Sequence, residues 1–68
     1  LVAGVATISD ARVSSTSGAS YSIKSVNGTI GAYYVITYSS GTITVTSKQS
    51  GGTTQTLDTS KLMILYTP

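Results

Sequence analysis

Alternating apolar and polar residues are the main pattern in the chain, and they predict β-strands rather than helices. The clearest case is the segment 42–46, where Ile43 and Val45 alternate with three threonines. Successive side chains of a strand point to opposite faces, so this pattern places Ile43 and Val45 inward and the threonines outward. No segment shows the sustained periodicity of an amphipathic helix. We therefore predict an all-β chain.

Five such segments follow one another, separated by glycine-containing or polar stretches. Asn27-Gly28 suits a tight type I′ hairpin turn, because both residues tolerate positive φ. Polar loops are expected over 14–20 and 48–56, the second of them flexible, and a turn at Ser39-Ser40-Gly41. The pattern predicts a single β-domain over 1–68, a small antiparallel β-sandwich or barrel of about five strands joined by hairpin-type turns. The expected strands cover 2–9, 20–26, 29–38, 42–46 and 61–67.

Two of these strands carry bulky residues on both faces. Tyr33 and Tyr34 are adjacent in a strand, so one should lie in the core and the other at a second layer or a subunit interface. The run 62–65 is apolar throughout. That composition is typical of a central strand, or of a strand covered by a second subunit.

The composition adds a reason to expect oligomerisation. Serine and threonine supply 24 of the 68 residues and should cover the solvent-facing sides of the strands. A domain this short buries a modest core, and the chain has no cysteine or histidine to staple it with disulfides or the usual zinc site. We expect copies of the chain to complete the core. The residues predicted for that interface are Tyr33, Val35, Leu62, Met63, Ile64 and Leu65.

The few charged side chains do not suggest catalysis. Asp10 and Asp58 are the only carboxylates, and nothing in their spacing brings them into one pocket for acid–base work. We expect both to bond local backbone N–H groups at a turn and at a strand entry. The prediction is therefore no enzymatic activity, with no catalytic residue, cofactor or metal site. Asn27-Gly28-Thr29 also matches the N-glycosylation pattern, but the turn signal accounts for it.

Charge and hydropathy also bound the expected partners. The net charge of +2 is small and scattered along the sequence, so no nucleic-acid partner is expected. No apolar stretch approaches the roughly 20 residues of a membrane span, so no membrane partner is expected either. The chain begins at Leu1 rather than Met, which suggests a processed, trimmed or longer protein.

The order of segments resembles a small β-domain of tailed-bacteriophage virion proteins. The resemblance rests on an opening strand at 2–8, a strand beginning Gly31-Ala32-Tyr33, the segment Gly-Thr-Ile-Thr-Val-Thr-Ser at 41–47, and Asp-Thr-Ser before an apolar strand and a final Pro at 58–68. The sequence departs from that pattern at Ile43 and Met63, where an aromatic or other large residue is often found.

The resemblance implies a trimeric structural module. Such domains form capsid decoration proteins, head fibres and the C-terminal modules of tail fibres or tailspikes. The leading expectation is a capsid decoration or head-fibre module that forms a homotrimer on the surface of a phage particle, bound to the major capsid protein or another virion protein. One alternative is a receptor-binding tip that recognises a host-surface glycan, with hydrogen bonds from loops 14–20 and 48–56. A further alternative is a subunit of a bacterial surface filament or adhesin.

Overall fold

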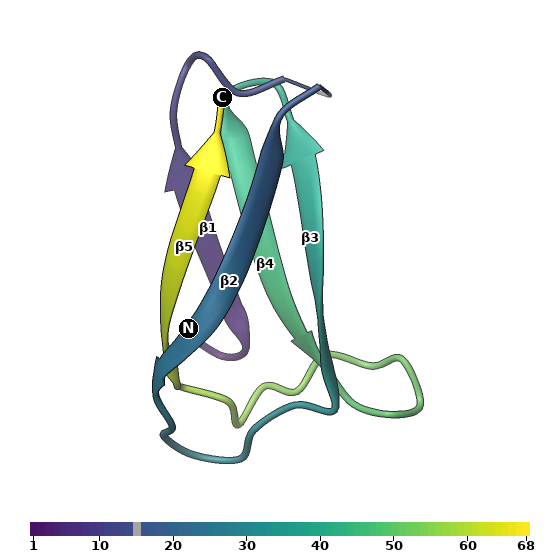
Figure 1. The fold of residues 1–68 in the computed structure, drawn as a ribbon. Coiled ribbons are helices and arrows are strands. Elements are labelled where there is room, and N and C mark those ends of the chain that lie inside the picture. Colours follow the sequence, from purple (N-terminus) through teal and green to yellow (C-terminus); the bar gives the residue numbers. More distant parts are fainter. Residues whose placement is uncertain (15) are drawn as a thin grey trace.

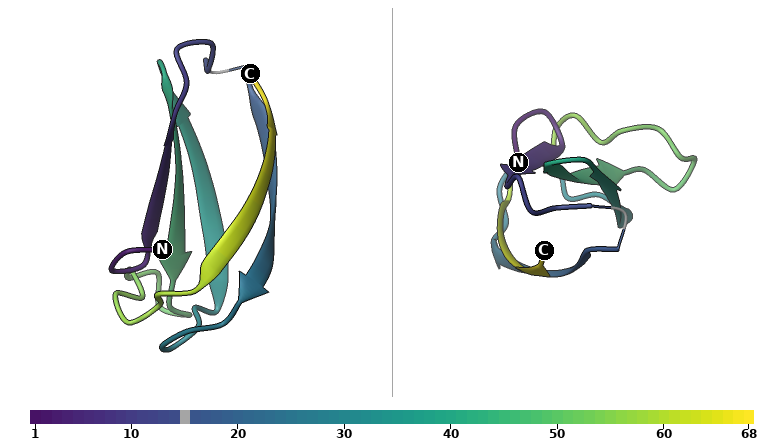
Figure 2. Two further views of the ribbon diagram at one scale, coloured as in Figure 1. Left: turned by 90° about the vertical axis from the view of Figure 1, so that its left-hand side faces the viewer. Right: turned by 90° about the horizontal axis from the view of Figure 1, so that it is seen from above.

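The protein is a β-sandwich of five strands in two antiparallel sheets (Figure 1), as the alternating pattern predicted. The computed structural model describes residues 1–14 and 16–68. Three strands form the larger sheet in the order β1-β4-β3, and two form the smaller sheet, β2-β5. The sheets face each other, and the two views of Figure 2 show the space between them. The strands are β1 Val5–Ser9, β2 Gly18–Ser25, β3 Tyr33–Ser39, β4 Thr42–Lys48 and β5 Lys61–Thr67.

The central strand β4 confirms the clearest sequence prediction. Ile43 and Val45 are fully buried between the sheets. Thr42, Thr44 and Thr46 face outward, and Thr44 lies in register between Thr7 of β1 and Thr37 of β3. The strand is longer than predicted, because its alternation continues through the buried Ser47 to Lys48.

The core is small. Val13 is the only other hydrophobic side chain among the described residues that is buried to the same degree as Ile43 and Val45. It lies in the connection between β1 and β2, where its carbonyl accepts a hydrogen bond from the Gly41 N–H at 2.9 Å. The expectation that Ser and Thr cover the solvent faces is wrong for three serines, which are buried: Ser17, Ser47 and Ser60.

The prediction of a hairpin at Asn27-Gly28 is wrong. The strands on either side of it lie in different sheets, since β2 pairs with β5 and β3 pairs with β4. Gly28 adopts a φ of 71°, but it bridges to Asp58 in the connection that precedes β5. The segment 26–32 is thus a crossover between sheets, and β3 begins at Tyr33 rather than at residue 29.

In the part of the chain that the structure describes, one connection is a tight hairpin, instead of the series that the sequence suggested. Ser40-Gly41 joins β3 to β4 within the larger sheet. The first strand is also shorter than predicted, because Ala3 and Gly4 both have positive φ and turn the chain before β1. β2 begins at Gly18, inside the predicted loop 14–20, and position 15 of that loop lies outside the described residues.

The loop 48–56 is held by its own backbone rather than free. The Gln49 N–H donates to the Thr53 carbonyl at 2.7 Å, and the Gln55 N–H donates to the Ser47 carbonyl at 2.8 Å. A bridge between Lys48 and Thr54 extends the pairing beyond β4.

The last strand, β5, has the predicted bounds, but it is not central. It pairs only with β2, so it is an edge strand of a two-stranded sheet. Among the five strands only β4 has a neighbour on both sides.

Candidate functional site

Asp58 is the centre of a buried polar cluster that ties the connection before β5 to the larger sheet. Its side chain is fully buried. One carboxylate oxygen, Oδ2, accepts hydrogen bonds from the Ser47 hydroxyl at 2.7 Å, the Tyr34 hydroxyl at 2.8 Å and the Gly31 N–H at 3.2 Å. The other oxygen, Oδ1, accepts from the Ser60 N–H at 3.0 Å. Every buried side-chain polar atom of the described residues has a partner, so the cluster carries no orphaned group.

Gly31 is required by this arrangement. A Cβ at that position would collide with the Ser47 hydroxyl and press on the Lys48 backbone. This close approach of the backbone brings the Gly31 N–H to Asp58.

The cluster keeps Asp58 ionised. Burial alone raises the pKa of the Asp58 carboxyl, but hydrogen bonds from Ser60, Ser47 and Tyr34 outweigh burial and hold that pKa well below its usual range. Burial and the hydrogen bond to Asp58 raise the pKa of Tyr34 to about 12. A carboxylate with so low a pKa is a poor proton donor at neutral pH.

Ser60 extends the cluster to the crossover between sheets. Its hydroxyl accepts a hydrogen bond from the Asn27 N–H at 3.1 Å. The Ser60 carbonyl accepts one from the amino group of Leu1 at 2.7 Å. The Asp58 side chain was predicted to bond local backbone groups, and the Ser60 N–H confirms that part. The contacts from Tyr34, Ser47 and Gly31 were missed.

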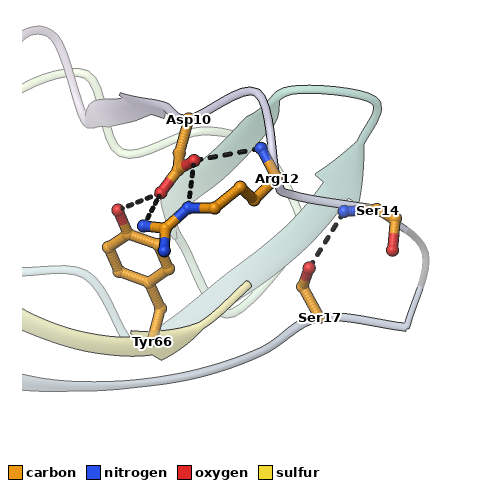
Figure 3. A network of polar contacts seen from close by, with 5 residues as sticks. All are labelled: Asp10, Arg12, Ser14, Ser17 and Tyr66. Carbon is orange, nitrogen blue, oxygen red and sulfur yellow. Dashed lines mark hydrogen bonds and ion pairs between the residues drawn. The ribbon is translucent and has the colours of Figure 1, made fainter.

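Asp10 forms a second tyrosine–aspartate contact, shown in Figure 3. Its Oδ2 accepts from the Tyr66 hydroxyl of β5 at 2.8 Å and pairs with the Arg12 guanidinium at 2.8 Å. The Arg12 N–H donates to Oδ1 at 3.0 Å, which confirms the predicted local turn contact. Hydrogen bonds from Arg12 and Tyr66 hold the pKa of Asp10 well below its usual range. The bond to Asp10 raises the pKa of Tyr66.

The serine-rich stretch beside Arg12 is also hydrogen-bonded to itself. The Ser14 N–H donates to the buried Ser17 hydroxyl at 2.9 Å (Figure 3), and the Ser17 N–H donates back to the Ser14 carbonyl at 3.1 Å. This pairing shapes the turn that leads into β2.

The two carboxylates lie at opposite ends of the sandwich. Asp10 follows β1 at the end where β5 finishes, and Asp58 precedes β5 at the other end (Figure 1). They therefore do not share a site. The loops predicted at 14–20 and 48–56 also lie at opposite ends, since the first leads into β2 and the second follows β4.

The six residues predicted for a subunit interface fall on three different surfaces. Leu62 and Ile64 face the larger sheet, opposite Ile23 and Tyr21 of β2, and are half-buried parts of the fold. Met63 and Leu65 face outward on the smaller sheet and are 58% and 77% exposed.

Tyr33 and Val35 face outward on the larger sheet, beside Lys48 and Thr46 of β4. Tyr33 is 43% exposed, whereas its neighbour Tyr34 points inward and meets the Tyr21 ring edge-on at 4.8 Å. The prediction that these adjacent tyrosines separate to opposite faces is confirmed. The two outward pairs lie on opposite sides of the sandwich, so a single flat contact cannot bury both.

The part of the chain that the structure describes lacks three further features. It encloses no pocket. It has no group of three or more His, Cys, Asp or Glu side chains placed to hold a metal ion. It contains no helix long and apolar enough to cross a membrane.

Comparisons of the chain with protein-family models, with curated proteins and with solved structures found no match.

Proposed function

We propose that the chain is a structural virion module that assembles as a homotrimer, as a capsid decoration or head-fibre domain on a phage particle. The observation that carries the self-assembly is the outer face of β5. Met63 and Leu65 are large, exposed hydrophobic residues of an edge strand that pairs on one side only. A large apolar side chain gains about 1.5–3 kcal/mol when it passes from full exposure to full burial.

The small core supports the same proposal. Only three hydrophobic side chains among the described residues are fully buried, and Tyr21 and Ile23 of β2 remain partly exposed on the inner face. Contacts between copies would add the burial that the isolated domain lacks. The number of copies and the place on the particle come from the resemblance to phage β-domains.

The test of assembly is the substitution Leu65→Asp. We expect the purified chain to sediment as a trimer and the variant as a folded monomer, because the charge would be buried unpaired at the contact. Analytical ultracentrifugation gives the mass, and far-ultraviolet circular dichroism checks that the strands persist. Ile64→Asp is unsuitable, since Ile64 faces the interior and its loss would damage the fold.

Thr7→Asp is the matched control. Thr7 is exposed on the outer face of the other sheet, so this variant should remain a trimer. Dissociation by Thr7→Asp but not by Leu65→Asp would instead move the contact to the larger sheet. A monomeric unsubstituted chain would refute the assembly proposal. Electron cryo-microscopy of the particle that carries the chain tests the location, and density along a bacterial filament would refute it.

A further inference from the structure

The fold gathers positive charge that is scattered in the sequence. Lys24 lies near the end of β2, Lys48 ends β4, and Lys61 begins β5. Because β2 and β4 both run toward the end from which β5 starts, all three lysines lie at one end of the sandwich (Figure 1). The three lysines, which are scattered along the sequence, are therefore gathered at one end of the fold.

The two carboxylates do not offset these lysines by ion pairing. The one ion pair that the described residues form is Arg12 with Asp10, at the opposite end. Asp58 lies on the lysine side but is fully buried, and both of its oxygens are occupied by hydrogen bonds. The exposed charge of this end is therefore positive.

Exposed apolar side chains lie at the same end of the sandwich as the lysines. Val26 and Leu57 are each 63% exposed, and Ile30 is 43% exposed. They come from two connections that are bonded together: the Thr29 N–H donates to the Leu57 carbonyl at 3.1 Å, and the Thr59 N–H donates to the Asn27 carbonyl at 3.1 Å. The apolar residues thus project from a braced backbone, which lowers the conformational entropy that binding would cost.

We propose that this end, the basic end, is a docking surface for an acidic and partly apolar patch on another protein. It is formed by the side chains of Lys24, Val26, Ile30, Lys48, Leu57 and Lys61. An apolar centre with a charged rim is the usual anatomy of a protein–protein contact, and charge complementarity steers the partner to it. The inference is independent of trimer formation, since each copy carries a complete basic end.

Other occupants fit less well. A second basic end would be repelled by like charge, so the surface is distinct from the self-contact proposed on β5. Recognition of anionic lipid typically uses four to eight clustered basic residues, against three lysines here. Binding of single-stranded nucleic acid uses a basic groove lined with stacking aromatics, and Tyr33 is the only tyrosine near this end on an outer face.

The test measures binding of the full chain to four immobilised probes. These are a synthetic peptide of alternating Glu and Leu, a peptide of alternating Glu and Ser with the same charge, phosphatidylserine vesicles, and a thymine oligonucleotide. We expect the Glu/Leu peptide to bind most tightly. Replacing all three lysines by glutamine should weaken that binding by about tenfold or more. The double variant Val26→Ser with Leu57→Ser should weaken binding of the Glu/Leu peptide but leave the Glu/Ser peptide unchanged.

A charge-matched control separates location from net charge. Three substitutions at the opposite end, Ser9→Asp, Ser39→Asp and Ser40→Asp, also lower the net charge from +2 to −1. This variant should bind the Glu/Leu peptide more tightly than the triple glutamine variant does. Equal loss in both variants would overturn the proposal, as would equal binding of both peptides. Preferential binding of vesicles or of the oligonucleotide would also overturn it, in favour of a membrane or a nucleic acid.

Discussion

Asp58 holds a buried negative charge in a chain that has only six charged side chains. A buried carboxylate is costly unless several donors compensate it, and here two hydroxyls and two backbone N–H groups do so. The donors come from β3, from β4, from the crossover and from Ser60, just before β5. One side chain therefore links the larger sheet to the crossover and to the connection before β5.

The substitution Asp58→Asn tests this role. The amide is similar in size but presents an N–H₂ group to donors that need an acceptor. We expect the free energy of unfolding to fall by about 3 kcal/mol, which is the upper end of the range for a hydrogen bond to a charged group. Tyr34→Phe removes a single donor and should cost about 1–2 kcal/mol. Urea unfolding measures both.

Tyr33→Phe is the control for the tyrosine variant, since it removes a hydroxyl from the neighbouring residue on the exposed outer face. It should change the unfolding free energy by less than about 0.5 kcal/mol. If Asp58→Asn costs no more than this control, the cluster does not stabilise the fold.

At the scale of elements, the local sequence pattern predicted where the strands lie. It did not predict which strands pair with each other. The alternation of 42–46 identified Ile43 and Val45 as core, because the period of two is a property of each strand alone. Pairing depends on residues far apart in the sequence. Asn27-Gly28 has the local chemistry of a hairpin turn, yet β2 pairs with β5 rather than with β3. The Asp58 contacts escaped prediction for the same reason, since Gly31, Tyr34 and Ser47 are 27, 24 and 11 positions away.

Gly28 lies in the crossover between sheets rather than in the hairpin turn that the sequence predicted. A pair of alanine substitutions tests its role there. Gly28 has positive φ, and a Cβ there would collide with the Leu57 carbonyl. Gly28→Ala should therefore lower the unfolding free energy by more than about 1 kcal/mol. A Cβ on Gly18 would meet nothing within 4 Å, so Gly18→Ala should be neutral or slightly stabilising. Thermal unfolding compares the two, and equal effects would refute the role assigned to the crossover.

For the whole molecule, two tyrosine–aspartate contacts close the sandwich at its opposite ends. Tyr66 of the smaller sheet reaches Asp10 after β1, and Tyr34 of the larger sheet reaches Asp58 before β5. Each contact therefore links an element of one sheet to a connection that leads into or out of the other. Only three hydrophobic side chains of the described residues are fully buried. The polar links and the copies proposed to cover β5 therefore stabilise the protein in different ways. The links fix the geometry of the domain, and the proposed copies would supply apolar burial.

These links predict the pH dependence of stability. The pKa values of Asp10 and Asp58 are lowered in the folded state, so their contribution is present above the unfolded value near 3.9 and is lost as the pH falls below it. The pKa of Tyr34 is raised to about 12, so its contribution is present below the unfolded value near 10 and is lost as the pH rises toward 12.

The melting temperature followed by circular dichroism should therefore form a plateau from about pH 5 to about pH 9, because the chain has no histidine to titrate within it. It should fall on both sides of that range. Tyr34→Phe should lower the plateau but reduce the alkaline fall, since only Tyr66 remains of the two tyrosines whose pKa is raised by an aspartate. The acid fall should persist in that variant. Asp10 still accepts a hydrogen bond from Arg12, and Asp58 still accepts one from the Ser60 N–H. An unchanged alkaline fall in Tyr34→Phe would show that the Tyr34–Asp58 contact does not link the two sheets in solution.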